Sequence, residues 1–134
     1  MYGAVEPLTG QSFFLELPAL NTQGFQLFLD HFVATDPASF HLLLLDNGAF
    51  HKARALRLPP NIGLLFLPPY TPELNPIERL WRDLKDWLAQ YQPTSLEDLS
   101  ELLCVRLKQY STMTLRSLTG FSYLLLAAQA VSVL

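Results

Sequence analysis

The sequence predicts a single α/β domain, and three features of its 134 residues support this prediction. Two runs of continuous apolar residues, "HLLLLD" at 41–46 and "NIGLLFLP" at 61–68, are typical of strands covered on both faces in a parallel sheet. A strongly amphipathic segment at 76–88 predicts a helix. The chain is 50% hydrophobic and 16% charged, which suits one compact domain with a core.

The first elements are predicted to be a hairpin followed by a helix. "MYGAVEP" and "SFFLELP" are short strand candidates, and the intervening "LTGQ" contains the Thr and Gly typical of a turn. Asn21 or Thr22 can then cap a helix that runs to about Ala34. Helical spacing places five apolar side chains on its buried face: Phe25, Phe28, Leu29, Phe32 and Val33.

The two apolar runs are joined by "AFHKARALRL", which we interpret as a short crossover. A strand, a crossover helix and a second parallel strand form a right-handed unit. Side chains at the carboxyl ends of such strands face the crevice where ligands bind. Asp46 is predicted to lie at such an end.

The loop "PPYTPELNP" contains four of the ten prolines, which restrict its conformations. Asn75 can cap the helix that follows, and Pro76 suits its first position. One face of this helix is apolar, formed by Ile77, Leu80, Trp81, Leu84, Trp87 and Leu88. The opposite face carries Arg79, Arg82, Asp83, Lys85 and Asp86.

The C-terminal third is predicted to be helical. Thr94 and Glu97 match a capping box at the start of one helix, which continues through Leu107. From about Thr114 the chain is again helical and amphipathic. Its tail, "FSYLLLAAQAVSVL", is shorter than a membrane span and is interrupted by Ser and Gln, so we expect a packing helix and no membrane partner.

Charge and composition narrow the function classes. The net charge of −3 argues against a protein that holds DNA mainly by bulk electrostatics. Six of the nine basic residues nevertheless lie between Asp46 and Trp87, so a polyanion would dock there. A single cysteine, Cys104, excludes an intrachain disulfide, and the N-terminus shows no signal peptide, so export is not indicated.

Two carboxylates, Asp46 and Glu78, are the candidate site. Each has a structural explanation: Asp46 as a turn or cap residue, and Glu78 as the capping-box partner of Asn75. Together they end one parallel strand and open the helix after its neighbour, which predicts that they share one rim of the sheet. Two such carboxylates repel each other unless a hard cation lies between them, and Mg²⁺ or Mn²⁺ is the natural candidate.

Three segments carry a family resemblance: "YGAVEPLTGQSFFLEL", "LLLDNGAFHKA" and "LLFLPPYTPELNPIERLWRDLK". They resemble the catalytic domain of bacterial insertion-sequence transposases related to the mariner group, over nearly the whole chain. The resemblance implies an RNase H-like fold, a mixed sheet flanked by helices, with an Asp, Asp, Glu triad that binds two divalent metals. By this match Asp46 resembles the second acid and Glu78 the third, 32 positions later.

The implied activity is metal-dependent DNA cleavage and strand transfer at transposon ends, in the bacterial cytoplasm. We expect Asn47 and His51 to orient a ligand or contact phosphate, and for His51 a structural or supporting role is the alternative to direct participation. Further candidates for DNA contact or support of the site are Lys52, Arg54, Asn75, Arg79 and Arg82. Tyr70 and Trp81 are interpreted as packing residues rather than base-stacking ones.

The sequence departs from the family at its start. In the resembling proteins the first aspartate precedes the segment that matches "YGAVEP", and neither Glu6 nor Glu16 matches that position. We therefore expect 1–134 to be a partial catalytic domain without the first central strand, its aspartate or an N-terminal DNA-recognition domain.

Three accounts follow from this departure. The chain is completed by an upstream transposase polypeptide, or it is an inactive truncated remnant that acts as an interaction or regulatory fragment. In the third account it is a small α/β binding domain in which the two acids are only caps. Self-association into a homo-oligomer remains open under all three.

Overall fold

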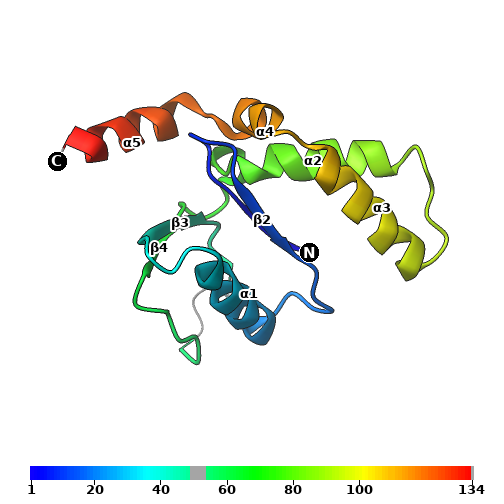
Figure 1. Ribbon diagram of the computed structural model, residues 1–134, viewed down its shortest axis with the longest axis horizontal. Coiled ribbons are helices and arrows are strands. Elements are labelled where there is room, and N and C mark those ends of the chain that lie inside the picture. Colours follow the sequence, from blue (N-terminus) through cyan, green and yellow to red (C-terminus); the bar gives the residue numbers. More distant parts are fainter. Residues whose placement is uncertain (49–53, 134) are drawn as a thin grey trace. The chain divides into compact units, whose positions relative to one another are not determined.

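The computed structural model describes residues 1–48 and 54–133, and its helices and strands confirm the predicted α/β class (Figure 1). The N-terminal elements are β1 (Tyr2–Val5), β2 (Ser12–Leu15), α1 (Thr22–Thr35), β3 (His41–Leu45) and β4 (Ile62–Phe66). The elements that follow are the short 3₁₀ helix η2 (Pro72–Leu74), α2 (Ile77–Leu88), α3 (Leu96–Gln109), α4 (Thr112–Thr119) and α5 (Ser122–Val133).

The chain divides into two compact units. The first unit comprises Met1–Ala4 and Phe13–Asn75, and the second comprises Val5–Ser12 and the chain from Pro76 onward. The turn of the β1–β2 hairpin is therefore grouped with the C-terminal helices, although most of the two strands belongs to the first unit.

The predicted hairpin and first helix are confirmed. β1 pairs with β2, and the Asn21 side chain caps α1 by accepting a hydrogen bond from Gly24 N at 2.8 Å. The Tyr2 hydroxyl donates to Ala19 O at 3.0 Å and accepts from Asn21 N at 3.0 Å, which ties β1 to the start of the helix. A Cβ on Gly24 would lie 2.6 Å from that hydroxyl oxygen, so the close approach requires glycine.

The core of the first unit is rich in aromatic rings. Five side chains are buried in it: Tyr2, Phe25, Phe28, Leu29 and Ile62. The ring of Phe28 lies 5.7 Å from that of Tyr2 and 5.5 Å from that of Phe13, distances at which aromatic pairs stabilise each other beyond simple burial.

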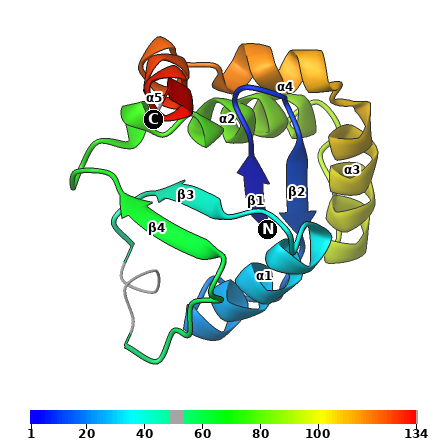
Figure 2. The ribbon, with the colours of Figure 1, turned by 60° about the vertical axis from the view of Figure 1, so that its left-hand side comes forward.

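β3 and β4 form the predicted parallel pair, with His41 opposite Ile62 and Leu45 opposite Phe66 (Figure 2). The prediction that both faces of this strand pair are buried is wrong for the described residues. Alternate residues, including Ile62, point to the core, whereas Leu42 and Leu65 on the other face are 64% and 52% exposed. The described strands form two separate two-stranded sheets rather than one mixed sheet.

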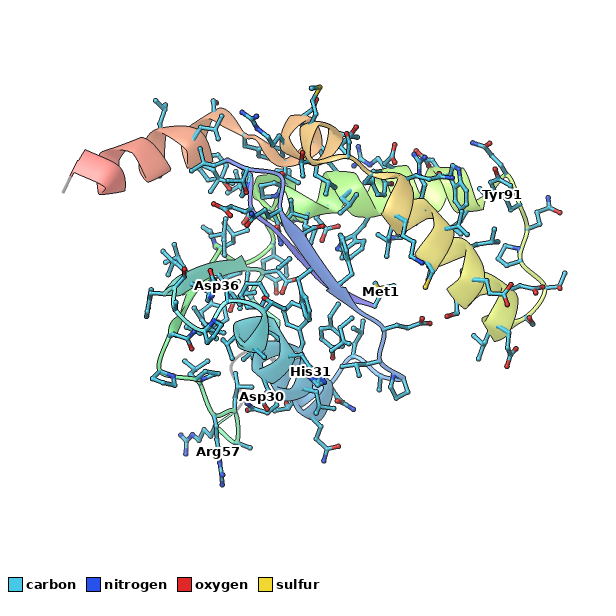
Figure 3. The ribbon with its side chains drawn as sticks, in the orientation of Figure 1. Met1, Asp30, His31, Asp36, Arg57 and Tyr91 are labelled. Atoms are coloured by element: carbon cyan, nitrogen blue, oxygen red, sulfur yellow. The ribbon has the colours of Figure 1, made fainter. Side chains whose placement is uncertain are left out.

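The connection from β3 to β4 is described at residues 46–48 and 54–61, and neither stretch contains a helix. It is held against α1 by one glutamine. Gln26 Oε1 accepts from Arg57 N at 2.7 Å, and its Nε2 donates to Arg57 O at 2.8 Å and to Asp30 Oδ1 at 3.0 Å. Figure 3 labels Asp30 on α1 and Arg57 on this connection.

In the second unit α2 packs against α3 and α4, and Figure 2 shows α4 running beside α2. The predicted apolar face of α2 is confirmed, since Leu80 and Leu84 are buried in it together with Leu115 from α4. The hairpin turn joins the same unit through Gly10, whose φ is 76°. A Cβ there would lie 2.0 Å from Thr112 O, so no other residue fits without a shift of the backbone.

Both predicted capping residues in this region are wrong. Pro76 occupies the cap position of α2 with helical φ and ψ and no side-chain cap, while Asn75 ends η2 by donating its backbone N–H to Pro72 O at 3.0 Å. α3 begins one residue later than the predicted box. Its cap is Ser95, whose Oγ accepts from Asp98 N at 3.0 Å.

The helical C-terminal region is confirmed as two helices rather than one. α4 ends at Gly120, whose N–H bonds to Arg116 O at 2.8 Å, and α5 follows it. Among the described residues, none of the helices is long and apolar enough to cross a bilayer.

Candidate active site

Asp46 lies where sequence reasoning placed it, directly after the parallel strand β3. Its side chain is exposed, and Oδ1 accepts a hydrogen bond from Gly48 N at 3.2 Å, as in an Asx turn. Leu67 N donates to Leu45 O at 2.8 Å, so the parallel ladder continues to the residue just before Asp46. The chain therefore leaves β4 at the same sheet edge that presents this carboxylate.

Asn47 directly follows Asp46 and carries a polar side chain. The residue is half-buried and its Oδ1 is fully buried, with no hydrogen-bond partner within the described part of the chain. A buried oxygen without a donor costs about 1–3 kcal/mol. Such an oxygen suits a site that a cation or a water completes, because neutral amide oxygens are common ligands of hard cations.

Glu78 stands in the first turn of α2 and is half-buried. A negative side chain is stabilised there because the helix dipole is positive at its N-terminus. Asn75, its predicted capping partner, is buried immediately before the helix. Asp46 belongs to the first unit and Glu78 to the second, so their convergence on one rim stays a prediction.

A metal site needs hard oxygen ligands, which Asp46, Asn47 and Glu78 supply by type. Among residues 1–48 and 54–133, no group of three or more His, Cys, Asp or Glu side chains gathers closely enough to hold a metal ion. The donor set therefore fits Mg²⁺ or Mn²⁺ in chemistry, and a full set of protein ligands requires a further group. His51 and Lys52, two other candidates, lie outside the described residues.

The basic candidates on α2 are exposed. The Arg79 guanidinium lies 4.3 Å from the centre of the Phe121 ring, a cation–π contact that restrains it while leaving its N–H groups open to water. Arg82 and Lys85 extend from the same side of the helix and make no ion pair with any described residue. Arg54, on the connection to β4, is also exposed.

Sequence reasoning missed a polar cluster that joins α2 to α3. Arg106 Nη2 donates to Asp83 Oδ2 at 2.9 Å, and the Tyr110 hydroxyl donates to the same oxygen. The Arg106 guanidinium also lies 4.7 Å from the Tyr110 ring and 5.5 Å from the Trp87 ring. The sequence does not predict this pairing, because Asp83 is indistinguishable from the other charged residues on the solvent-facing side of the helix.

This cluster shifts the pKa values of its members. The hydrogen bond from Tyr110 holds the pKa of Asp83 below its usual range, and Arg106 acts in the same direction. Burial, followed by the bond to Asp83, raises the pKa of Tyr110 to about 12. Burial disfavours the charged form of Arg106, but its bonds to Asp83 and Tyr110 outweigh this, so its pKa is raised. At neutral pH the charge of Asp83 is therefore balanced by Arg106. Arg82 and Lys85, on the same helix, have no such ion-pair partner among the described residues.

Trp81 and Tyr70, both interpreted as packing residues, differ in outcome. Trp81 is half-buried on α2, as expected of a packing residue. Tyr70 is 99% exposed and has a positive φ of 60°, so its prediction as a packing residue is wrong.

Residues 1–102 match the sequence model of a family described as DDE superfamily endonuclease. The chain belongs to the DDE superfamily endonuclease family. This membership confirms the transposase-type resemblance and identifies DNA as the substrate on which such a domain acts. A curated relative, "Uncharacterized protein y4pE/y4sA" from Sinorhizobium fredii (strain NBRC 101917 / NGR234), is 35% identical over 106 residues, 78% of each chain. No solved structure matches this DDE endonuclease chain.

Proposed function

We propose that this chain is the metal-dependent DNA-cleaving domain of a mariner-like insertion-sequence transposase with an RNase H-like fold, in which Asp46 and Glu78 are catalytic ligands. The observation that carries the proposal is the exposed carboxylate of Asp46 at the carboxyl end of β3, next to the buried amide oxygen of Asn47, which has no donor among the described residues. Family membership supports DNA cleavage as the reaction.

The path of the chain supports Glu78 as the second ligand. The loop 67–76 begins at Leu67, which is hydrogen-bonded to Leu45, the residue before Asp46. α2 begins directly after that loop. Glu78 lies three positions after Asn75, the last residue of the first unit. A glutamate in the first turn of a helix that follows a strand–loop connection commonly faces the carboxyl edge of a sheet.

A divalent cation held at these residues would supply Lewis-acid activation of the attacking oxygen and stabilisation of the leaving oxygen in an in-line displacement at phosphorus. The carboxylates of Asp46 and Glu78 would bind it with hard oxygens, and Asn47 Oδ1 would bind either the cation or a water. Arg79, Arg82 and Lys85 would position the DNA by contacts to phosphates, which set register without reading sequence.

The third acidic ligand is proposed to come from an upstream transposase polypeptide, which would also add a strand to the β3–β4 sheet. One finding supports a polypeptide partner: the β3–β4 face carrying Leu42 and Leu65 is exposed, and an apolar sheet face is normally covered by another layer. The same exposed face supports a second candidate function, in which the chain is an inactive fragment that regulates a full-length transposase by binding to it.

Nicking of supercoiled plasmid DNA in Mn²⁺ tests the proposal, with the chain alone and with the upstream polypeptide added. We expect nicking that Asp46→Asn and Glu78→Gln both abolish. Asp86→Asn, which removes an exposed carboxylate of the same helix, is the matched control and should nick like wild type.

Nicking that survives in Asp46→Asn would contradict the assignment of the site. Nicking only after addition of the upstream polypeptide would support completion. Binding of that polypeptide without any nicking would favour the regulatory fragment instead.

A further inference from the structure

Tyr70 is an aromatic residue placed almost entirely in water. Its exposed fraction of 99% exceeds that of every other large hydrophobic residue in the described part of the chain. Aromatic side chains normally bury a large area, so a fully exposed ring gains nothing from folding. Its hydroxyl and ring make no hydrogen bond or ring contact with any described residue.

The backbone holds this ring in a fixed direction at a cost. Tyr70 has a φ of 60°, the left-handed region that disfavours residues with a Cβ. Pro68, Pro69 and Pro72 restrict the backbone on either side of it. Thr71 Oγ1 donates to Pro68 O at 2.6 Å, which closes the turn around the tyrosine. Strained residues of this kind persist where the surroundings enforce them, and they concentrate at functional sites.

The position of this turn indicates its ligand. The loop starts at the sheet edge that presents Asp46, through the bond between Leu67 and Leu45, and it leads into the helix that carries Glu78 and exposed Arg82. Both ends of the loop therefore belong to the residues that we propose act on DNA. Tyr70 therefore lies, along the chain, in the segment that connects these two sets of residues.

We propose that Tyr70 is a stacking platform for an unpaired base of the DNA substrate, which rests on the proposed function. A base that leaves the duplex stack loses its stacking and pairing energy, which costs a few kcal/mol. A planar ring offers it a replacement surface, and every base has a face that can use it. The hydroxyl is not needed for stacking, so phenylalanine should serve equally well.

The test measures binding of a fluorescently labelled single-stranded oligonucleotide in EDTA, so that cleavage plays no part. Tyr70→Asn removes the ring and keeps a residue that tolerates the left-handed backbone, and Tyr70→Gly is a second ringless variant. We expect about a tenfold loss of affinity in both. Tyr70→Phe should bind within about twofold of wild type.

Phe40→Asn is the matched control, because it removes another ring of the first unit that is 67% exposed. It should leave DNA affinity unchanged. Melting temperatures of the two Tyr70 variants should equal or exceed that of wild type, since the lost ring packs on nothing and the strain is reduced. Quenching of 2-aminopurine in the oligonucleotide by wild type, but not by Tyr70→Asn, would identify base stacking directly.

Equal affinity of wild type and the ringless variants would overturn the stacking role, as would a wild-type chain that nicks plasmid but does not bind the oligonucleotide. In both cases the proposed cleavage function would stand. Ring-dependent binding without any metal-dependent nicking would support the stacking role and contradict the cleavage function. A change of oligomeric state in Tyr70→Asn with unchanged DNA affinity would show that the ring docks on protein and would overturn the proposal.

Discussion

The aromatic cluster of the first unit and the α2–α3 contact of the second are stabilised in different ways. The first buries rings against each other, with Phe25 and Phe28 at most 4% exposed. α3 contains no buried residue, and the polar contacts of Asp83, Arg106 and Tyr110 tie it to α2. Apolar burial gives a large and pH-independent stabilisation, whereas a half-exposed polar cluster gives a smaller one that depends on protonation.

The largest effect is expected from the aromatic cluster. Phe28→Ala removes a ring that contacts Tyr2, Phe13 and Phe32, so we expect a loss of about 3–5 kcal/mol in the free energy of unfolding, measured by urea denaturation. Leu27→Ala, at the neighbouring position that is 48% exposed, is the control and should cost less than about 0.5 kcal/mol. Similar losses in the two variants would show that the cluster is not the core of the first unit.

A smaller loss is expected from the polar cluster. Arg106→Met keeps most of the side-chain length and removes the cation that pairs with Asp83, which is 38% exposed. Because solvent screens such a pair, we expect a loss of about 1 kcal/mol. Lys108→Met, an exposed change on the same helix, should be neutral. Full stability of Arg106→Met would mean that α3 is held by other contacts.

The smallest effect is the pH dependence of that cluster. The folded pKa of Asp83 lies below its ordinary value, so its stabilisation is present above about pH 4 and is lost as pH falls through the folded pKa. The pKa of Tyr110 is raised to about 12, so its contribution is present below about pH 10 and is lost as pH rises through about 12.

Tyr110→Phe removes the hydroxyl on which both effects depend. At pH 7 the free energy of unfolding of wild type should exceed that of the variant by less than about 1 kcal/mol. This difference should become smaller toward pH 3 and toward pH 12. Urea midpoints at these three pH values measure the gap. Tyr91→Phe, which changes an exposed tyrosine, should follow the wild-type profile. A gap that stays constant with pH would contradict the role of the hydroxyl.

Elements held by apolar burial could be predicted from the sequence, whereas polar details such as the caps of α2 and α3 could not. The helix Thr22–Thr35 and the parallel strands follow from apolar periodicity, a strong and local signal that tertiary packing reinforces. The cap of α3 was misplaced by one residue because two neighbouring residues have similar chemistry. Thr94 and Ser95 both suit a cap, and the extended backbone of Ser95 decides between them.

The candidate site was predicted only in part. Asp46 could be placed at a strand end because a continuous apolar run ends there. The pairing of Asp83 with Arg106 could not, since these residues lie 23 positions apart in the sequence and meet only when α2 and α3 dock. The exposure of Leu42 and Tyr70 also had no local signal, because apolar and aromatic residues are normally assigned to the core.

The hairpin turn belongs to the second unit, which affects how the chain can be cut into fragments. Val5–Ser12 packs with the C-terminal helices, with Gly10 against Thr112, although the residues on both sides of that segment belong to the first unit. The chain thus passes from one unit to the other and back before it reaches Pro76. A protease cut between Asn75 and Pro76 would not release two self-sufficient halves, because the C-terminal piece would leave an eight-residue segment of its own structure on the other fragment.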